Sequence, residues 1–512
     1  MAALWVGSGH LLARCSDPLE ILSGSGPVWR RLLLGLALCG TAQAAPPPRI
    51  DLVVMPAWKG WSRPGRTTEL DIRLTTDTAT RATLDVVAGR QSGHVDVDLR
   101  PGRAVRLHLP VGSAQAVAVS AAAPGGPPGQ REVSIAQSES PLLGVGLATD
   151  DGVQLEGFHT VALAADDLPR NASAYASIDA LILDTPTLSA LDQQQLGALV
   201  AHAAGCGRIV VVNTDARVRR VLDGAGGCGG HALMSATSLT QAKEMLDASL
   251  AVNLAAPMSP GGIGQLAPPD PRIWNRVAVI VAAYFAVAAL AVLFFSTLPV
   301  LLALPALATV AVLALLHAMP SSSQLVVWSE GASGTQLARY QAWQRFQGLV
   351  RGQTRVAIPP QLASAALPCD SAQAMRFAFD ADRGQALSAG FETRLFRQVS
   401  LCYSGSFPMT RAIAIQAHSD GLRDVQNAGT TAWPDGVVLA GGLAHSLPAL
   451  GPGAHTTIGP NTGKPLRDAV LRAAMARTPP DGVAALWALD LSGVAAVPID
   501  STGWLLVSLP LP

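Results

Sequence analysis

The sequence predicts a multidomain α+β membrane protein, and three observations lead to that fold class. Residues 277–316 of the 512-residue chain contain no Asp, Glu, Lys or Arg. Short runs of alternating apolar and polar residues precede residue 130, and apolar strand-like runs alternate with helical patterns after it. We therefore expect an antiparallel β-sandwich, an open α/β (flavodoxin-like) domain, a two-helix transmembrane hairpin and a C-terminal mainly-β domain.

The composition excludes one class of function. The chain has 36 basic and 36 acidic residues, and only 14% of its residues are charged. A nucleic-acid-binding protein usually has a basic surface and a high isoelectric point, whereas this sequence is neutral with a pI near 7.1. We therefore expect no nucleic-acid partner.

The first 44 residues read as a mis-annotated start followed by a signal peptide. Arg30 and Arg31 precede the apolar run 32–38, and small residues end at Ala44. This order is typical of a secretory signal with cleavage after Ala44. The stretch 1–27 shows no pattern that fits such a signal, so we expect the true start near residue 28.

Residues 45–130 are predicted to form the β-sandwich domain. Their apolar residues recur with period two, and Pro-Gly turns separate the runs, as in antiparallel sheets. We expect Trp58 and Trp61 to pack in or over the sandwich core, with a sugar-stacking surface as the alternative. The clearest alternating runs lie at residues 70–74, 95–99 and 105–109.

Residues 140–256 are predicted to form the open α/β domain. Apolar runs typical of buried strands alternate with helical patterns, which indicates a mostly parallel sheet. The expected strands lie at residues 143–147, 161–163, 180–183 and 209–212, and the expected helices at residues 188–204 and 238–253.

A linker at 257–273 leads to the predicted transmembrane hairpin at 277–317. The charge-free run is long enough for two spans of about 20 residues. Trp274 and Arg276 stand where membrane-interface residues are expected. Two spans after a cleaved signal put both large domains on the same side of the membrane, outside the cytoplasm.

Residues 320–512 are predicted to form the C-terminal mainly-β domain. A strand is expected at 324–328 and an amphipathic helix at 335–350, because Tyr340, Trp343 and Phe346 recur at helical spacing. A further helix is expected at residues 466–477 and a terminal strand at residues 504–509.

Four cysteines remain in the mature chain, as one pair before the predicted hairpin and one pair after it. An exported protein favours the local disulfides Cys206–Cys228 and Cys369–Cys402. Four unpaired buried thiols are the alternative. No CxxC motif or zinc-like Cys/His spacing occurs.

Six short motifs give the chain a resemblance to a family of bacterial envelope proteins. That family joins a β-sandwich, a class I glutamine-amidotransferase-like domain, a transmembrane hairpin and a C-terminal β region. The resemblance implies an accessory role beside an AAA+ ATPase and von Willebrand A-type system. The motifs are GWSRPGR at 60–66, IDALIL at 178–183, LDQQQL at 191–196, GCGRIV at 205–210, VQNAG at 425–429 and DGVVL at 435–439.

We identify no catalytic, cofactor-binding or metal-binding residues. An amidotransferase nucleophile needs a strand-to-helix elbow, whereas Cys206 precedes a strand. Four carboxylates lie near the expected strand ends, where open α/β sheets bind ligands, although turn formation also explains them. These candidate crevice residues are Asp150, Asp151, Asp166 and Asp167.

The sequence therefore predicts a non-catalytic inner-membrane accessory or scaffold protein with periplasmic interaction domains. The membrane and partner proteins of an envelope complex are its expected partners. Two alternatives remain open. One is an envelope enzyme with a degenerate amidotransferase-like domain, and the other is a periplasmic ligand-sensing module.

Overall fold

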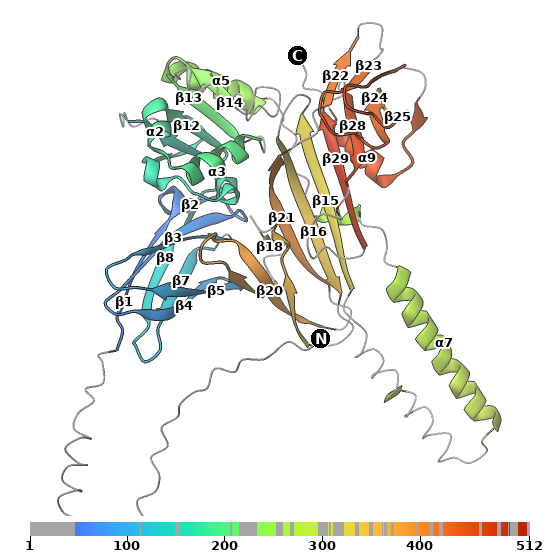
Figure 1. The fold of residues 1–512 in the computed structure, drawn as a ribbon, viewed down its shortest axis with the longest axis horizontal. Helices are drawn as coiled ribbons and strands as arrows, with labels where there is room; N and C mark the ends of the chain where they lie inside the picture. Colours follow the sequence, from blue (N-terminus) through green and yellow to red (C-terminus); the bar gives the residue numbers. More distant parts are fainter. Residues whose placement is uncertain are drawn as a thin grey trace, which may run out of the picture. The chain divides into compact units, whose positions relative to one another are not determined.

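The computed structural model describes most of the chain from residue 47 onward (Figure 1). The described residues are 47–508 apart from 113, 149–153, 205–206, 214–232, 252–259, 267–270, 295–305, 307–308, 311–321, 333–336, 348–351, 361, 363–365, 370–372, 395–397, 409–412, 419–422, 460–462, 479–482, 490 and 492–499.

The N-terminal β-sandwich packs a three-stranded antiparallel sheet, in the order β1-β3-β6, against a larger sheet. Alternate residues of both sheets point inward and form one apolar core, as the period-two pattern requires. The small sheet contains β1 (Ile50–Pro56), β3 (Thr68–Thr76) and β6 (Val105–Val111). A short 3-10 helix η1 (Ala57–Gly60) and the paired strands β2 (Trp61–Ser62) and β9 (Ala136–Gln137) adjoin it.

The larger sheet of the sandwich combines strands from two distant parts of the chain. Its order is β17-β20-β19-β5-β4-β7-β8, and β19 pairs in parallel with β5 from Met375↔Gln91 to Ala378↔His94. In Figure 1 the orange β20 accordingly lies beside the blue strands. Its members are β4 (Thr80–Ala88), β5 (Gln91–Leu99), β7 (Ala116–Ala122), β8 (Gly129–Ser134), β17 (Gly352–Ala357), β19 (Met375–Phe379) and β20 (Ala386–Thr393).

A glycine permits this strand addition. Gly93 lies in the middle of β5, and a Cβ added there would be 2.5 Å from the Phe379 ring of β19. Phe379 in turn packs against the sandwich core. The three added strands come from residues that the sequence assigns to the C-terminal domain, so the sheets of the structure do not follow the division at residue 320.

The α/β part contains a five-stranded parallel sheet in the order β11-β10-β12-β13-β14. By position along the chain this order is 2-1-3-4-5, which is the flavodoxin-like arrangement. Its strands are β10 (Leu142–Gly146), β11 (His159–Ala162), β12 (Ala180–Asp184), β13 (Arg208–Val212) and β14 (Leu233–Ala236). Its helices are η2 (Ala165–Asp167), η3 (Ala172–Ser177), α2 (Thr185–Ala190), α3 (Gln193–Ala204) and α5 (Leu239–Ala251).

A nine-stranded mixed sheet dominates the C-terminal part, in the order β18-β21-β16-β15-β29-β28-β24-β25-β27. One face packs against β19 and β20, and the opposite face packs against α6 and α9. The strands are β15 (Ser322–Ala332), β16 (Leu337–Gln347), β18 (Ala366–Pro368), β21 (Gln398–Pro408), β24 (Gly436–Ala440), β25 (Leu443–Leu447), β27 (Lys464–Pro465), β28 (Val483–Ala488) and β29 (Asp500–Ser508). The two helices are α6 (Pro260–Gln265) and α9 (Ala469–Arg477).

A separate three-stranded sheet shares an apolar core with the C-terminal end of the large sheet. It consists of β22 (Ile413–Ala417), β23 (Arg423–Asn427) and β26 (His455–Ile458). With it, sheets account for most of the described chain. The protein is therefore mainly β.

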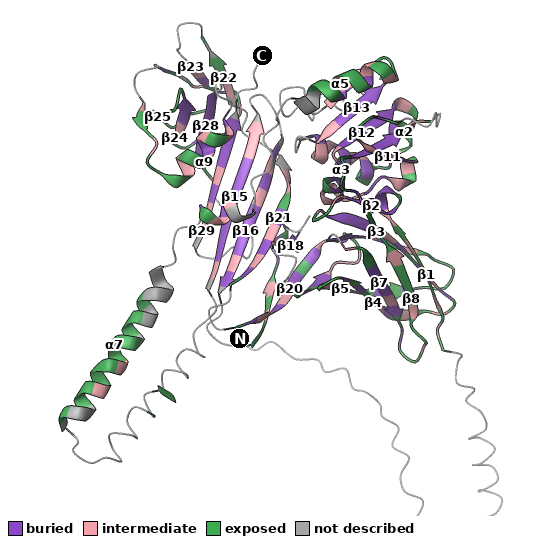
Figure 2. Cartoon of the chain, turned by 180° about the vertical axis from the view of Figure 1, so that it is seen from behind, coloured by how far each residue is buried: buried purple, intermediate pink, exposed green. Residues whose placement is uncertain are grey.

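The predicted transmembrane hairpin at 277–317, and with it the predicted fold class, is wrong. Among the described residues of this region, 277–294 belong to helix α7 (Pro271–Phe294), which is mainly exposed in Figure 2. Within the described residues, no helix combines the length and the apolar character that a membrane span requires. The absence of charge in 277–316 showed only that no ionised side chain occurs there, whereas a membrane span also needs a helix of sufficient length and apolar character, which the described residues do not provide.

The predicted amphipathic helix at 335–350 is also wrong, because the residues form strand β16. Tyr340, Trp343 and Phe346 do recur at helical spacing. A second pattern with period two runs through the same segment, however, and Ala338, Tyr340, Ala342, Gln344 and Phe346 are all buried. β16 pairs with β15 on one edge and with β21 on the other, so the backbone groups of both edges form hydrogen bonds within the sheet. These pairings favour the strand over the helix.

Candidate functional site at the domain junctions

Asp179 joins the α/β sheet to the β-sandwich. Its Oδ1 lies 2.9 Å from Nη1 of Arg66, and its Oδ2 lies 3.2 Å from Nε of Arg63. The same Oδ2 accepts a hydrogen bond from the amide of Leu142 at 2.8 Å. Arg63 also donates to the carbonyl of Ser138 at 2.8 Å. One carboxylate thus holds two arginines of residues 60–66 against the start of the parallel sheet.

A stack of three rings lies next to this junction. The indole of Trp58 is fully buried, donates to the carbonyl of Ala174 at 3.0 Å, and meets Tyr175 edge-on at 5.1 Å. Tyr175 stacks on His202 at 5.1 Å. Burial lowers the pKa of His202 to about 4 and raises the pKa of Tyr175. The stack is therefore neutral over the physiological range.

A second junction forms around Glu69, a carboxylate of β3 that is almost completely buried. It accepts the amide hydrogens of Arg170 at 3.1 Å and of Asn171 at 2.7 Å. On β6, Nδ1 of His108 lies 3.3 Å from Glu69, and Nε2 lies 3.2 Å from Nη1 of Arg170. A guanidinium can only donate, so Nε2 of His108 accepts this hydrogen bond from Arg170.

Two further carboxylates orient the arginines of this junction. Asp192 lies 2.6 Å from Nε of Arg170. Burial pushes the pKa of Asp192 upward, but hydrogen bonds from the amide of Gln195 and from Arg170 outweigh it and leave the pKa below its ordinary value. Asp71, the cross-strand partner of His108, accepts hydrogen bonds from Nε and Nη2 of Arg106, and these raise the pKa of Arg106.

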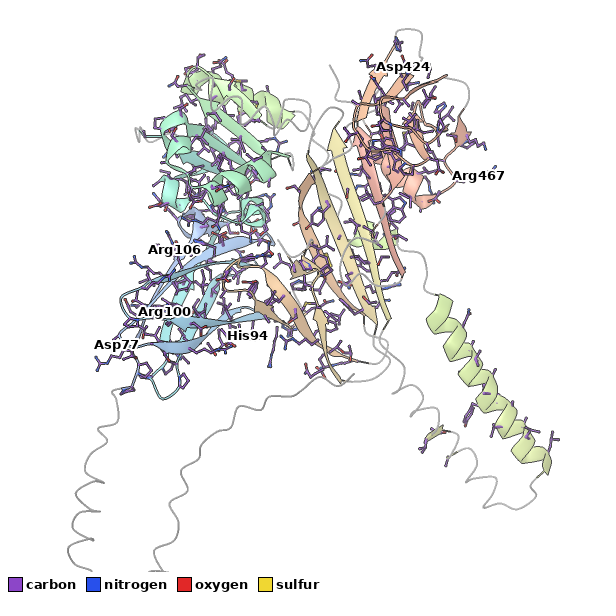
Figure 3. The ribbon with its side chains drawn as sticks, viewed as in Figure 1. Asp77, His94, Arg100, Arg106, Asp424 and Arg467 are labelled. Carbon is purple, nitrogen blue, oxygen red and sulfur yellow. A yellow bond between two sulfur atoms is a disulfide. The ribbon has the colours of Figure 1, made fainter. Side chains whose placement is uncertain are left out.

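A cavity of about 530 Å³ opens beside these groups. It is bounded by β6 of the sandwich, by the α/β part and by the turn between β19 and β20. Figure 3 labels Arg106, one of the residues that lines it. The full lining is Arg106, His108, Arg170, Asn171, Gln194, Ala381, Asp382, Arg383 and Gly384.

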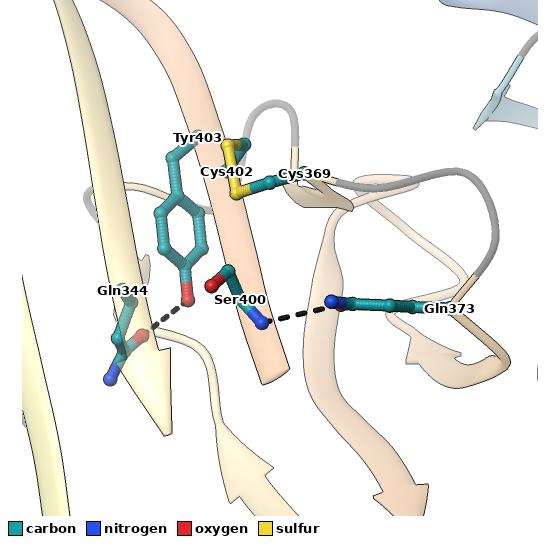
Figure 4. Close-up of a disulfide and its surroundings, with 6 residues drawn as sticks. All are labelled: Gln344, Cys369, Gln373, Ser400, Cys402 and Tyr403. Atoms are coloured by element: carbon teal, nitrogen blue, oxygen red, sulfur yellow. Dashed lines mark hydrogen bonds between the residues drawn. A yellow bond between two sulfur atoms is a disulfide. The ribbon is translucent and has the colours of Figure 1, made fainter. Parts of the chain in front are cut away.

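A disulfide joins Cys369 to Cys402, so the prediction of a disulfide bond is confirmed for this pair (Figure 4). Beside it, the hydroxyl of Tyr403 donates to the side-chain carbonyl of Gln344 at 2.5 Å, and burial raises the pKa of Tyr403. The bond closes a loop that contains β19 and β20. The disulfide therefore links the segment that carries β19 and β20, two strands of the sandwich sheet, to strand β21.

A third charged cluster fastens α9 to the C-terminal sheet. Glu330 of β15 accepts hydrogen bonds from Trp328 at 2.8 Å, from its cross-strand partner Arg339 at 2.8 Å and from Arg477 of α9 at 3.0 Å. Burial pushes the pKa of Glu330 upward, but the two arginines outweigh it and lower the pKa. All charges of this cluster are paired with one another, which indicates a structural role.

Only some of the predicted site residues lie in the described part of the chain. Cys206, Cys228, Asp150 and Asp151 are outside it. Asp166 and Asp167 lie together in η2. Asp167 accepts the amide hydrogen of Ala164 at 2.8 Å and lies 3.8 Å from Nζ of Lys59, so it stabilises a turn.

The predicted interface residues Trp274 and Arg276 lie in the first turns of α7. A location of these two residues at a membrane interface remains a prediction. No group of three or more His, Cys, Asp or Glu residues within the described ranges is arranged to hold a metal ion.

Sequence reasoning missed the polar residues that the structure brings together. Glu69, Asp71, Arg106 and His108 alternate with apolar residues in two neighbouring strands, so their shared face was readable once β3 and β6 were paired. Asp184 was missed as well. It caps α2 through the amide of Thr187 at 2.8 Å and binds the amide of Ala148 at 2.6 Å, where the neighbouring strands β10 and β12 end.

Comparisons with known proteins add little. No family model matches the chain, and no curated protein matches it. Among solved structures, a fragment of native alpha-2-macroglobulin from Escherichia coli, from domain MG7 to the C-terminus, is 12% identical in sequence. The match covers 78% of this chain and 84% of that one, with a TM-score of 0.15, which is too low to support any inference.

Proposed function

We propose that the chain is an exported, non-catalytic scaffold protein whose β-rich parts bind partner proteins. The observation that carries this proposal is the shared seven-stranded sheet, in which β19 adds in parallel to β5 across more than 250 residues of sequence. Such an addition fixes distant parts of one chain to each other. A protein that must present several surfaces in a constant arrangement needs this property.

The charged side chains at the junctions support the same function. Asp179 with Arg63 and Arg66, and Glu69 with the amides of Arg170 and Asn171, all connect one part of the chain to another. We therefore assign these carboxylates and arginines a structural role, in which they hold separate parts of the chain together.

Two observations support export. The Cys369–Cys402 disulfide needs an oxidising compartment to persist. The sequence also contains two arginines, an apolar run and small residues up to Ala44, in the order of a secretory signal. Trapping the thiols of living cells with an alkylating reagent tests the point. Full oxidation of the pair is expected, and a reduced pair in freshly trapped cells would contradict export.

Site-specific photo-crosslinking of the full chain in its host tests the scaffold role. Met55 on β1 and Leu387 on β20 are large apolar side chains with exposed fractions of 49% and 54%. A crosslinker at either position is expected to give adducts of discrete mass with a second protein. The matched control is Asp98, an exposed polar position of β5. Uncrosslinked monomer at all three positions would contradict the proposal.

A further inference from the structure

The cavity beside Arg106 and Arg170 has the size and the lining of a small-molecule site. Its volume of about 530 Å³ falls within the range of roughly 300–1,000 Å³ that is usual for such sites. Its walls come from three segments that are distant in sequence. Polar and charged side chains dominate the lining, so the cavity suits a polar ligand.

Two arginines at this cavity are held in place but retain free donors. Arg106 binds Asp71 through Nε and Nη2, and Arg170 uses Nε for Asp192 and Nη1 for His108. Among the described residues, Nη1 of Arg106 and Nη2 of Arg170 have no hydrogen-bond acceptor. The carboxylates thus fix the orientation of both guanidinium groups and leave N–H donors for a ligand.

The rim adds a third arginine. Arg383 is exposed in the turn between β19 and β20, and its guanidinium has no acceptor among the described residues. The turn is held against β6, because Gly384 adopts φ +62° directly over the carbonyl of His108. Asn171 also lines the cavity, and its Oδ1 accepts from Ser173, which leaves its NH₂ group to donate.

We propose that this cavity binds a small, hydroxylated molecule that carries one oxyanion, either a phosphate or a carboxylate. Three guanidinium groups converge on one space, and planar N–H donors bind such oxygens with strong, charge-assisted hydrogen bonds. Asp382 and Gln194 also line the cavity. Their oxygens suit the hydroxyl groups of the ligand, and the charge of Asp382 disfavours a second anionic group.

Ligand binding would draw together the three segments that form the walls. The oxyanion would contact β6 through Arg106, the α/β part through Arg170 and the β19–β20 turn through Arg383. Since the ligand binds only the folded chain, it is expected to raise the unfolding temperature. The inference does not depend on the scaffold function, because a ligand can bind here whether or not partner proteins bind elsewhere.

Calorimetric titration of the purified full chain at low salt tests the proposal, with glucose 6-phosphate, glucuronate and neutral glucose as probes. Saturable binding of at least one of the two anionic sugars is expected, with no binding of glucose. Binding of only the phosphate sugar or only the carboxylate sugar identifies the oxyanion. Absence of saturable binding by both anionic sugars would overturn the proposal, as would equal binding of glucose.

A pair of charge-matched variants locates the site. Arg383→Gln removes a rim guanidinium that has no acceptor in the described chain, so its unfolding temperature without ligand should equal that of the wild type. It is expected to weaken binding of the anionic sugar about tenfold or more. Arg376→Gln removes a charge from another exposed position, on β19 outside the cavity, and should leave binding unchanged. Equal affinities of the two variants would overturn the assignment.

Discussion

Arg66 and Asp179 form an ion pair at 2.9 Å across 113 positions of sequence. Arg66 ends the motif GWSRPGR, and Asp179 is the second residue of the motif IDALIL. The structure thus explains two of the motifs behind the family resemblance by one contact. The charged residues of these two motifs hold the sandwich and the α/β sheet together.

Replacing Asp179 with Asn should destabilise the protein by about 2–4 kcal/mol. The carboxylate is mostly buried, and its loss leaves Arg63 and Arg66 without their counter-charge. Urea unfolding of the full chain measures the change. Asp98→Asn, which removes an exposed carboxylate with no ion pair among the described residues, should stay within about 0.5 kcal/mol of the wild type. Equal effects of the two substitutions would contradict the role of Asp179.

The central strands β12 and β13 of the α/β sheet could be predicted because they are buried on both faces. Residues 180–183 and 209–212 are therefore continuous apolar runs, which single-sequence reasoning recognises easily. The candidate site could not be predicted in the same way. Glu69 binds amides 101 and 102 residues away, and His108 meets Arg170 across 62 residues. Pairings of this kind depend on tertiary contacts that no local pattern encodes.

The addition of β19 to β5 was hidden for a similar reason. The seven-stranded sheet draws on residues 80–134 and 352–393, and the local pattern of either segment fits a sheet of its own. Gly93 was the available signal, since a glycine inside a strand often marks the close approach of another chain segment. Its partner, Phe379, could be named only from the structure.

Removal of the Cys369–Cys402 disulfide should destabilise the protein by about 3–4 kcal/mol. The bond closes a loop with a sequence separation of 33, which restricts the unfolded chain. Replacing both cysteines with Ser and measuring the free energy of unfolding by urea tests this expectation. Wild-type protein in excess reductant should match the double variant. If oxidised and reduced wild type unfold at the same urea concentration, the stabilising role is refuted.

Gly384→Ala should loosen the turn that closes the cavity. Gly384 has φ +62°, and an added Cβ would lie 2.2 Å from the carbonyl oxygen of His108. Gly441→Ala is the matched control, because Gly441 has φ +56° and an added Cβ would meet no atom within 4 Å. The control should cost about 1 kcal/mol from backbone strain alone. Gly384→Ala should cost at least about 2 kcal/mol more, and equal costs would show that the turn does not need this close approach.

His202 should make the protein less stable in mild acid. Burial against Tyr175 lowers the pKa of His202 to about 4 in the folded state, whereas an unfolded histidine has a pKa of 6.5. Between these values the unfolded chain takes up a proton that the folded chain does not. The free energy of unfolding should therefore fall as the pH drops from 6.5 towards 4, by up to roughly 3 kcal/mol.

The pH dependence of a His202→Leu variant isolates this contribution. Leucine has a similar volume and cannot be protonated, so the variant should lose stability less steeply than the wild type between pH 6.5 and 4. Above pH 7 the two slopes should agree, because His202 is neutral there in both states. If the free energy of unfolding of His202→Leu falls as steeply with pH as that of the wild type, the imidazole is protonated in the folded protein. That result would contradict a buried, neutral stack of His202 with Tyr175 and Trp58.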